Sequence, residues 1–184
     1  AVYVNHDDEP FALARDAHVR GVLAGNGVAL HTSKDHVIFE RSEVLTQSGG
    51  VYGVFTPYKN AWLKKLDGFY LKAYPVLRHA AALAVPPAGV AAGVPTLAAL
   101  GFETTNLASL KMPAGPAGAQ SMFADYLQRI DGYGQTRNFP AVKGPSYLST
   151  HLRFGTISIR QLAREAWQRM QGGSPGAEVW LSEL

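Results

Sequence analysis

The sequence predicts two units of different fold class. An α/β unit is expected over residues 1–71 and an all-α unit over residues 119–184, joined by an Ala/Gly/Pro-rich linker over residues 72–118. Three observations support this division. A strand–helix–strand pattern opens the chain, charges and apolar periodicity become scarce in the middle, and helical periodicity returns in the last third.

The α/β unit begins with a β-rich stretch, AVYVN at residues 1–5. A helix follows in PFALARDAHVRGVLAGNG, where Pro10 suits a first helical position. The expected apolar stripe of this helix is Ala12, Val19, Val22 and Leu23. Residues 28–32 and 37–39 are expected to be extended, so the order predicts a βαβ unit with parallel strands and a right-handed crossover. Because a stable sheet normally needs three or more strands, we expect the other strands to lie outside this sequence or to come from another chain.

The remaining elements are expected to be helical. VFTPYKNAWLKKL is typical of a turn followed by a helix, and QSMFADYLQRI places Met122, Tyr126 and Ile130 on one helical face. Pro145 is expected to open a helix that ends at Gly155, and Ser158 to cap the next helix. The inward residues of that helix are expected to be Ile159, Leu162, Ala166, Trp167 and Met170. VWLSEL starts a further helix, and both ends of the sequence look cut, so a piece of a longer protein is expected.

Composition excludes several classes of site. With no cysteine the chain forms no disulfide or thiolate metal site, and a reducing cytoplasm fits this composition. The six histidines lack metal-ligand spacing, and no apolar run has the length of a membrane span. The net charge of +3 permits polyanion binding without arguing for it. GYGQTR lacks the last glycine of a dinucleotide fingerprint, and GPSYL lacks the second glycine of a nucleophile elbow, so Ser146 is a poor nucleophile.

The stretch GPSYLSTHLRFGTIS, residues 144–158, is the best candidate for a ligand site. Ser146 and Ser149 are expected to share the first turn of a helix, where free N–H groups and the helix dipole suit a phosphate. The alternative is that Ser146 only caps its own helix. Just upstream, an exposed Tyr133 and Arg137 would suit a nucleotide or nucleic acid, while a packed tyrosine and a solvated arginine are the more common outcome.

Three segments taken together resemble one family. VFTPYKNAWLKKL, RIDGYGQTRNFPAVKGPSYLSTHLRFGTISIRQL and VWLSEL are similar to the DNA photolyase/cryptochrome family, and most closely to its class I cyclobutane pyrimidine dimer photolyases. The resemblance implies that residues 1–71 are the C-terminal part of a Rossmann-like parallel α/β antenna domain. It also implies that residues 119–184 are the first part of a helical domain that binds flavin adenine dinucleotide (FAD).

The resemblance assigns cofactor contacts residue by residue. Tyr133 matches a tyrosine at the phosphate region of the flavin nucleotide, and Trp180 matches a tryptophan beside the flavin. The cradle around the diphosphate corresponds to Pro145, Ser146, Tyr147, Leu148 and Ser149. Pro145 departs from the pattern, because the first cradle position is often threonine and proline offers neither a hydroxyl nor an N–H.

The resemblance also implies contacts with damaged DNA. Glu183 matches the glutamate that hydrogen-bonds the pyrimidine dimer, and Arg137 matches a position that contacts the DNA backbone. With Lys143 and Arg153, Arg137 is expected to form a basic face that grips phosphates without reading sequence.

The implied function is light-dependent repair of cyclobutane pyrimidine dimers by electron transfer from reduced FAD. The alternatives are a cryptochrome-type blue-light photoreceptor and an inert fragment. An antenna chromophore, a folate or a deazaflavin, is also implied, although Phe11 and Ala12 stand where some members carry a folate-contacting Asn-Glu pair. The full-length protein is expected to be a cytoplasmic monomer that binds damaged DNA and no membrane, whereas the chain alone is expected to bind flavin weakly and repair nothing.

Overall fold

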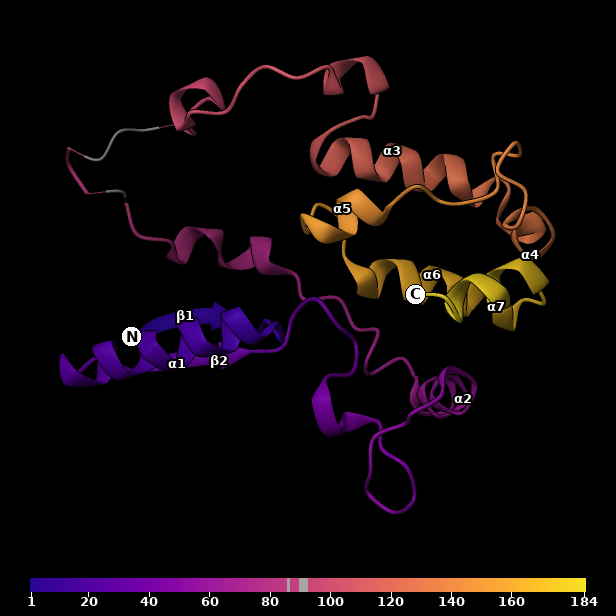
Figure 1. Ribbon diagram of the computed structural model, residues 1–184, viewed down its shortest axis with the longest axis horizontal. Helices are drawn as coiled ribbons and strands as arrows, with labels where there is room; N and C mark the ends of the chain where they lie inside the picture. Colours follow the sequence, from indigo (N-terminus) through magenta and orange to yellow (C-terminus); the bar gives the residue numbers. More distant parts are fainter. Residues whose placement is uncertain (86, 90–92) are drawn as a thin grey trace.

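The computed structural model describes residues 1–85, 87–89 and 93–184 (Figure 1). The helices and strands are β1 (Val2–Asn5), α1 (Pro10–Gly25), β2 (Leu30–Ser33), α2 (Phe55–Lys65), α3 (Gly115–Leu127), α4 (Tyr133–Thr136), α5 (Ser149–Arg153), α6 (Ile159–Gln171) and α7 (Pro175–Leu181). Short 3-10 helices lie at Arg41–Glu43, Val76–Ala82, Ala98–Leu100, Leu107–Leu110 and Ile130–Gly132, the last of which is η5. None of the helices in these ranges is long and apolar enough to cross a membrane.

The predicted βαβ unit is confirmed. β1 and β2 pair in parallel with Val2 opposite Leu30, and α1 connects them. The expected apolar stripe of α1 is only partly covered, because Ala12 is buried while Val19 and Val22 are 37% and 52% exposed. Within the described residues the sheet has these two strands.

The expectation that residues 37–39 form an extended strand is wrong. This segment bends and pairs with no strand among the described residues. Ile38 and Phe39 are instead 4% and 7% exposed and belong to the hydrophobic cluster that the helical unit shares. The segment is apolar because it packs into a core from one side. A buried strand requires the same apolar residues, so the sequence pattern is the same in both cases.

Aromatic side chains join α2 to the segment that follows the sheet. The ring of Phe39 meets those of Trp62 and Tyr70 edge to face, with centroids 5.6 and 4.7 Å apart. The ammonium of Lys65 lies 5.0 Å from the centre of the Phe39 ring. Edge-to-face pairs and a cation over a ring both add to simple burial, so this contact fixes α2 against the core.

Two arginines of α6 tie the helical unit to the α/β unit. Arg160 donates from Nη1 to the carbonyl oxygen of Asp35 over 2.5 Å and from Nη2 to that of Val37 over 3.0 Å. Arg164 donates to the carbonyl oxygen of Leu71 over 3.3 Å. The opposite face of α6 carries the predicted apolar residues, of which Leu162 and Ala166 are fully buried. One helix therefore serves as core on one side and as a tether on the other.

The middle of the chain makes an excursion away from both units (Figure 1). Its described part holds three of the short 3-10 helices, and the apolar side chains described there face solvent, with Val85 and Val94 89% and 94% exposed. α3 begins at Gly115, inside the predicted linker of residues 72–118. Residues 86 and 90–92 of that linker lie outside the described part of the chain.

Tyr126 of α3 provides a test of how the helical core tolerates polar atoms. Its side chain is fully buried, and its hydroxyl has no hydrogen-bond partner among the described residues. A buried donor without a partner costs free energy. We therefore expect Tyr126→Phe to raise the free energy of unfolding by about 1 kcal/mol. Urea unfolding followed by tryptophan fluorescence would measure this change.

The half-buried Tyr58 supplies the control for this substitution. Tyr58→Phe removes the same hydroxyl from a ring of α2 that is not fully buried, and it should leave the free energy of unfolding nearly unchanged. A loss of stability in Tyr126→Phe would contradict the prediction, because it would mean that the hydroxyl is bonded in the native state.

Candidate functional site

The serine-rich segment differs from its sequence prediction. The expectation that a helix opens at Pro145 is wrong, because α5 begins at Ser149 and ends at Arg153. Tyr147 has a φ of +57°, in the left-handed region, and this residue interrupts any helix between the two serines. Ser146 and Ser149 therefore do not share a helical turn. Ser146 lies in the irregular segment before the helix, and Ser149 is the first residue of the helix.

This irregular segment leaves polar donors without partners. Among the described residues, no hydrogen bond uses the N–H groups of Ser146, Tyr147 or Ser149. Ser146 Oγ accepts only a long bond of 3.5 Å from the N–H of Leu148, so capping occupies the hydroxyl weakly. A left-handed residue next to one in the right-handed region, such as Leu148 at φ −90° and ψ 0°, is the backbone combination found in anion-binding nests. The five-residue α5 adds little dipole of its own.

A network of charges holds the cradle loop, residues 144–148, against α3. Arg129 donates from Nη2 to the carbonyl oxygen of Pro145 over 2.9 Å. The same guanidinium contacts Asp125 at 2.5 Å, and Lys143 contacts Asp125 at 2.9 Å. Hydrogen bonds from Lys143 and Arg129 lower the pKa of Asp125 below its usual range. Sequence reasoning did not predict this network. The spacing of Asp125 and Arg129, four residues apart on the expected helix, could have indicated their ion pair.

Trp180 lies in the core of the helical unit. It is 3% exposed, and its ring lies 4.6 Å from that of Tyr126 and 6.1 Å from that of Phe123. Tyr133, half-buried at the start of α4, meets the ring of Tyr126 edge to face at 6.1 Å. Burial raises the pKa of Tyr133. The two predicted flavin contacts thus flank one buried tyrosine, and any contact of Trp180 with a ligand is limited to its small exposed edge.

Arg137 and Glu183 form an ion pair. Arg137 Nη1 donates to Glu183 Oε1 over 2.6 Å, and the two side chains are 32% and 38% exposed. The guanidinium also lies 5.8 Å from the centre of the Tyr133 ring. The hydrogen bond to Glu183 raises the pKa of Arg137. The structure therefore brings together the two residues expected to contact DNA, 46 positions apart in sequence, and sequence reasoning did not predict their contact.

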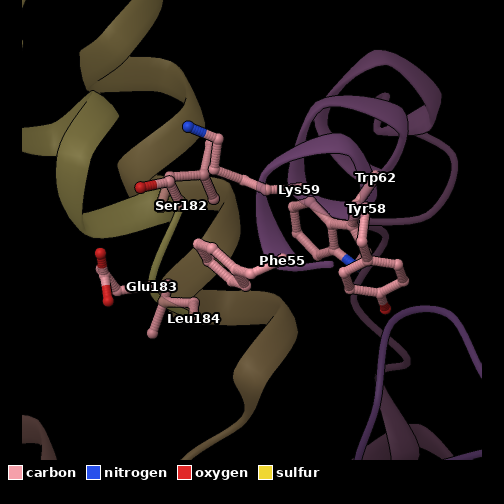
Figure 2. A pocket seen from close by; sticks show the side chains of 8 residues that line it. Phe55, Tyr58, Lys59, Trp62, Ser182, Glu183 and Leu184 are labelled. Carbon is pink, nitrogen blue, oxygen red and sulfur yellow. The ribbon is translucent and has the colours of Figure 1, made fainter. Parts of the chain in front are cut away.

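Two separate hollows lie beside these residues. The first, of about 250 Å³, lies between α2 and the end of α7 and is lined by Phe55, Tyr58, Lys59, Trp62 and residues 181–184. Figure 2 shows the carboxylate of Glu183 turned away from the aromatic rings of α2. Ser146 and Tyr147 line the other hollow, of about 390 Å³, with Asp125 and Lys143. The candidate cradle and Glu183 thus open onto different parts of the surface.

Close packing of α7 on η5 sets the position of both Trp180 and Glu183. A Cβ on Gly176 would lie 1.9 Å from the carbonyl oxygen of Ile130. Ser174 reinforces this approach, since its hydroxyl donates to Asp131 and accepts from the N–H of Ala177. Only glycine fits between these two backbones.

Substituting Gly176 tests this packing. We expect Gly176→Ala to lower the free energy of unfolding by about 1–3 kcal/mol, because one backbone must move away from the other. Gly134→Ala is the matched control. Its Cβ would only touch Val179 at 3.4 Å, and a helical alanine should be neutral or stabilising by about 0.5–1 kcal/mol. Urea unfolding of both variants would measure the difference, and equal effects would contradict the prediction.

The charges around Asp125 predict a dependence on pH. Since the folded pKa of Asp125 lies below that of an unfolded aspartate, about 3.9, its contribution is fully present above that value. The contribution is lost as the pH falls through the folded pKa. Asp125→Asn should therefore melt below the wild type at neutral pH, and the two midpoints should converge in acid. Thermal unfolding across a pH series would measure this, and a gap that is constant with pH would be inconsistent with it.

Comparisons with known proteins agree on one family. The model of the DNA photolyase family matches residues 1–81. The chain is 32% identical to the deoxyribodipyrimidine photo-lyase of Escherichia coli strain K12 over 190 residues, which cover 100% of this chain and 38% of that protein. It is also 32% identical to the Vibrio cholerae protein of the same name, covering 100% of this chain and 39% of the relative.

The fold is also shared with a solved structure. A bacterial class III photolyase from Agrobacterium tumefaciens superposes with a TM-score of 0.76 at 24% identity, covering 99% of this chain and 37% of that structure. The chain thus spans well under half the length of these relatives. The chain is thus similar in its first 81 residues to the DNA photolyase family, and over its whole length to proteins named deoxyribodipyrimidine photo-lyase.

Proposed function

We propose that this chain serves the light-dependent repair of cyclobutane pyrimidine dimers in DNA, as part of a protein that uses reduced FAD as electron donor. The observation that carries the proposal is the left-handed backbone at Tyr147. It leaves the N–H groups of Ser146, Tyr147 and Ser149 without partners, at the positions where the family resemblance implies a diphosphate. The names of the relatives, deoxyribodipyrimidine photo-lyase, support repair over the photoreceptor alternative.

The residues present fit a flavin nucleotide, with one exception. Bound and reduced, FAD supplies light-driven electron donation, while the protein supplies position and electrostatics. Tyr133 and the donors of the cradle loop would hold its phosphates, and Trp180 would offer its exposed edge. Pro145 has no N–H, and its carbonyl oxygen already accepts from Arg129, so it shapes the loop without contacting an anion. An antenna chromophore, folate or deazaflavin, stays a prediction.

The proposal gives this chain's own residues two tasks toward DNA. Arg137 would bind a backbone phosphate, and Glu183 would accept a hydrogen bond from the dimer once it has left the base stack. The partially exposed side chains of both are accessible to a ligand. Lys143 and Arg153 are accessible too, although each already contacts a carboxylate, that of Asp125 and that of Glu9 respectively. A monomeric state and a cytoplasmic location remain predictions.

Flavin binding by the cradle loop and the adjoining Ser149 is testable on this chain. FAD titration followed by fluorescence anisotropy should give weak binding, and Ser146→Ala with Ser149→Ala should weaken it about tenfold, because hydrogen bonds to a charged group are lost. Ser158→Ala is the matched control, since Ser158 precedes α6 without a side-chain capping bond. Unchanged affinity in the double variant, or the same loss in the control, would contradict this assignment.

Repair requires the length of a whole photolyase. We would exchange this chain for the segment of the E. coli photo-lyase that it matches and irradiate duplexes that carry one pyrimidine dimer. The chimera should restore the ultraviolet absorbance of intact bases, and Glu183→Gln should slow repair while flavin content stays the same. A flavin-loaded chimera that restores no bases would overturn the repair proposal.

A further inference from the structure

We propose that the Arg137–Glu183 ion pair is a latch that competes with DNA phosphate, so that phosphate binding releases Glu183 for the damaged bases. This inference rests on the proposed function. Its geometric basis is that the two side chains expected to contact DNA contact each other instead, over 2.6 Å. Arg137 comes directly after α4 and Glu183 follows α7, so the pair also bridges two helices.

The guanidinium has a second contact and spare donors. It lies 5.8 Å from the centre of the Tyr133 ring, a cation–π contact that favours its position beside α4. Among the described residues, its one hydrogen bond uses Nη1, which leaves the other N–H groups of the fork for a phosphate oxygen. At 32% exposure the side chain is within reach of a ligand from solvent. A phosphate can therefore approach Arg137 before the pair opens.

A phosphate on Arg137 weakens the hold on Glu183. Two anions on one guanidinium repel each other, and a phosphate offers the fork a bidentate partner. The carboxylate is then displaced from Nη1. Because the ion pair is partly exposed, it is weak, and a small difference in binding free energy between phosphate and carboxylate decides which of them Arg137 binds. The anion that bonds two N–H groups of the guanidinium at once has the advantage.

The pair differs from the other paired cations of the predicted basic face. Lys143 is paired with Asp125 and Arg153 with Glu9 at 3.7 Å, and neither carboxylate is expected to contact a base. Only at Arg137 does opening of the pair release a group with its own task at the damage. Undamaged DNA would break the pair and leave Glu183 without a new partner, whereas an extruded dimer supplies one. The latch thus favours damaged over undamaged DNA by differential binding.

The experiment measures binding to undamaged duplexes and to the same duplexes with one pyrimidine dimer, by fluorescence anisotropy with the whole chain. Glu183→Gln should tighten binding to undamaged DNA about two- to fivefold, because Arg137 is released from its competitor. Glu178→Gln is the matched control. It removes the same charge from α7, and Glu178 belongs to no ion pair among the described residues, so a smaller change is expected.

A double-mutant cycle separates the latch from general electrostatics. In an Arg137→Gln background, Glu183→Gln should change the affinity for undamaged DNA no more than the Glu178→Gln control does. Arg137→Lys keeps the charge without the fork, and it should retain only part of the coupling. Circular dichroism would confirm that each variant is folded.

The outcomes distinguish this inference from the proposed function. If the wild type prefers dimer-containing DNA but Glu183→Gln leaves undamaged binding at the level of the control, the latch is wrong and the proposed function stands. If Glu183→Gln tightens undamaged binding while neither the wild type nor any variant distinguishes the two duplexes, the competition at Arg137 is real but Glu183 is not released to damaged bases, and the latch as proposed is overturned. A wild type and a Glu183→Gln variant that both fail to bind DNA would overturn the latch.

Discussion

The close approach of α7 to η5 is the constraint on which the candidate site depends. Two backbones meet where residue 176 has no side chain, and the first turn of α7 is fixed there by the hydroxyl of Ser174. From this point the helix carries Trp180 into the core and brings Glu183 to the end of α4. The positions of Trp180 and Glu183 are not explained by their own sequence neighbours. Their positions follow from a helix whose start is set by the close contact of Gly176 with η5.

The same core explains why the site is rigid on one side and adjustable on the other. Trp180 and Tyr126 are buried and packed ring against ring, so they move little. Arg137, Glu183, Lys143 and Asp125 are exposed to different degrees and are held by charge. Interactions of this kind are individually weak and sensitive to salt. A ligand can therefore rearrange the charged layer while the aromatic layer keeps its shape.

Sequence predicted the elements better than it predicted their junctions. The βαβ unit, α2 and the apolar face of α6 follow from periodicity, because Leu162 and Ala166 repeat with the helical period and are buried. Residues 37–39 could not be told from a buried strand, since both environments select apolar side chains. The helix expected at Pro145 was wrong because a proline at a first helical position says nothing about the left-handed Tyr147 two residues later. Contacts such as Arg160 with Asp35 and Arg137 with Glu183 join positions far apart, and no local pattern encodes them.

The sheet of the α/β unit has a consequence for the chain in solution. In the described residues, β1 and β2 pair only with each other, so each strand presents one outer row of backbone N–H and C=O groups that no neighbouring strand occupies. Such open edges are templates for strand addition, and the exposed apolar side chains of Val2 and Tyr3 on β1 favour such an association. The sheet is therefore suited to pair with a further strand. At high protein concentration that strand can come from another copy of the same chain.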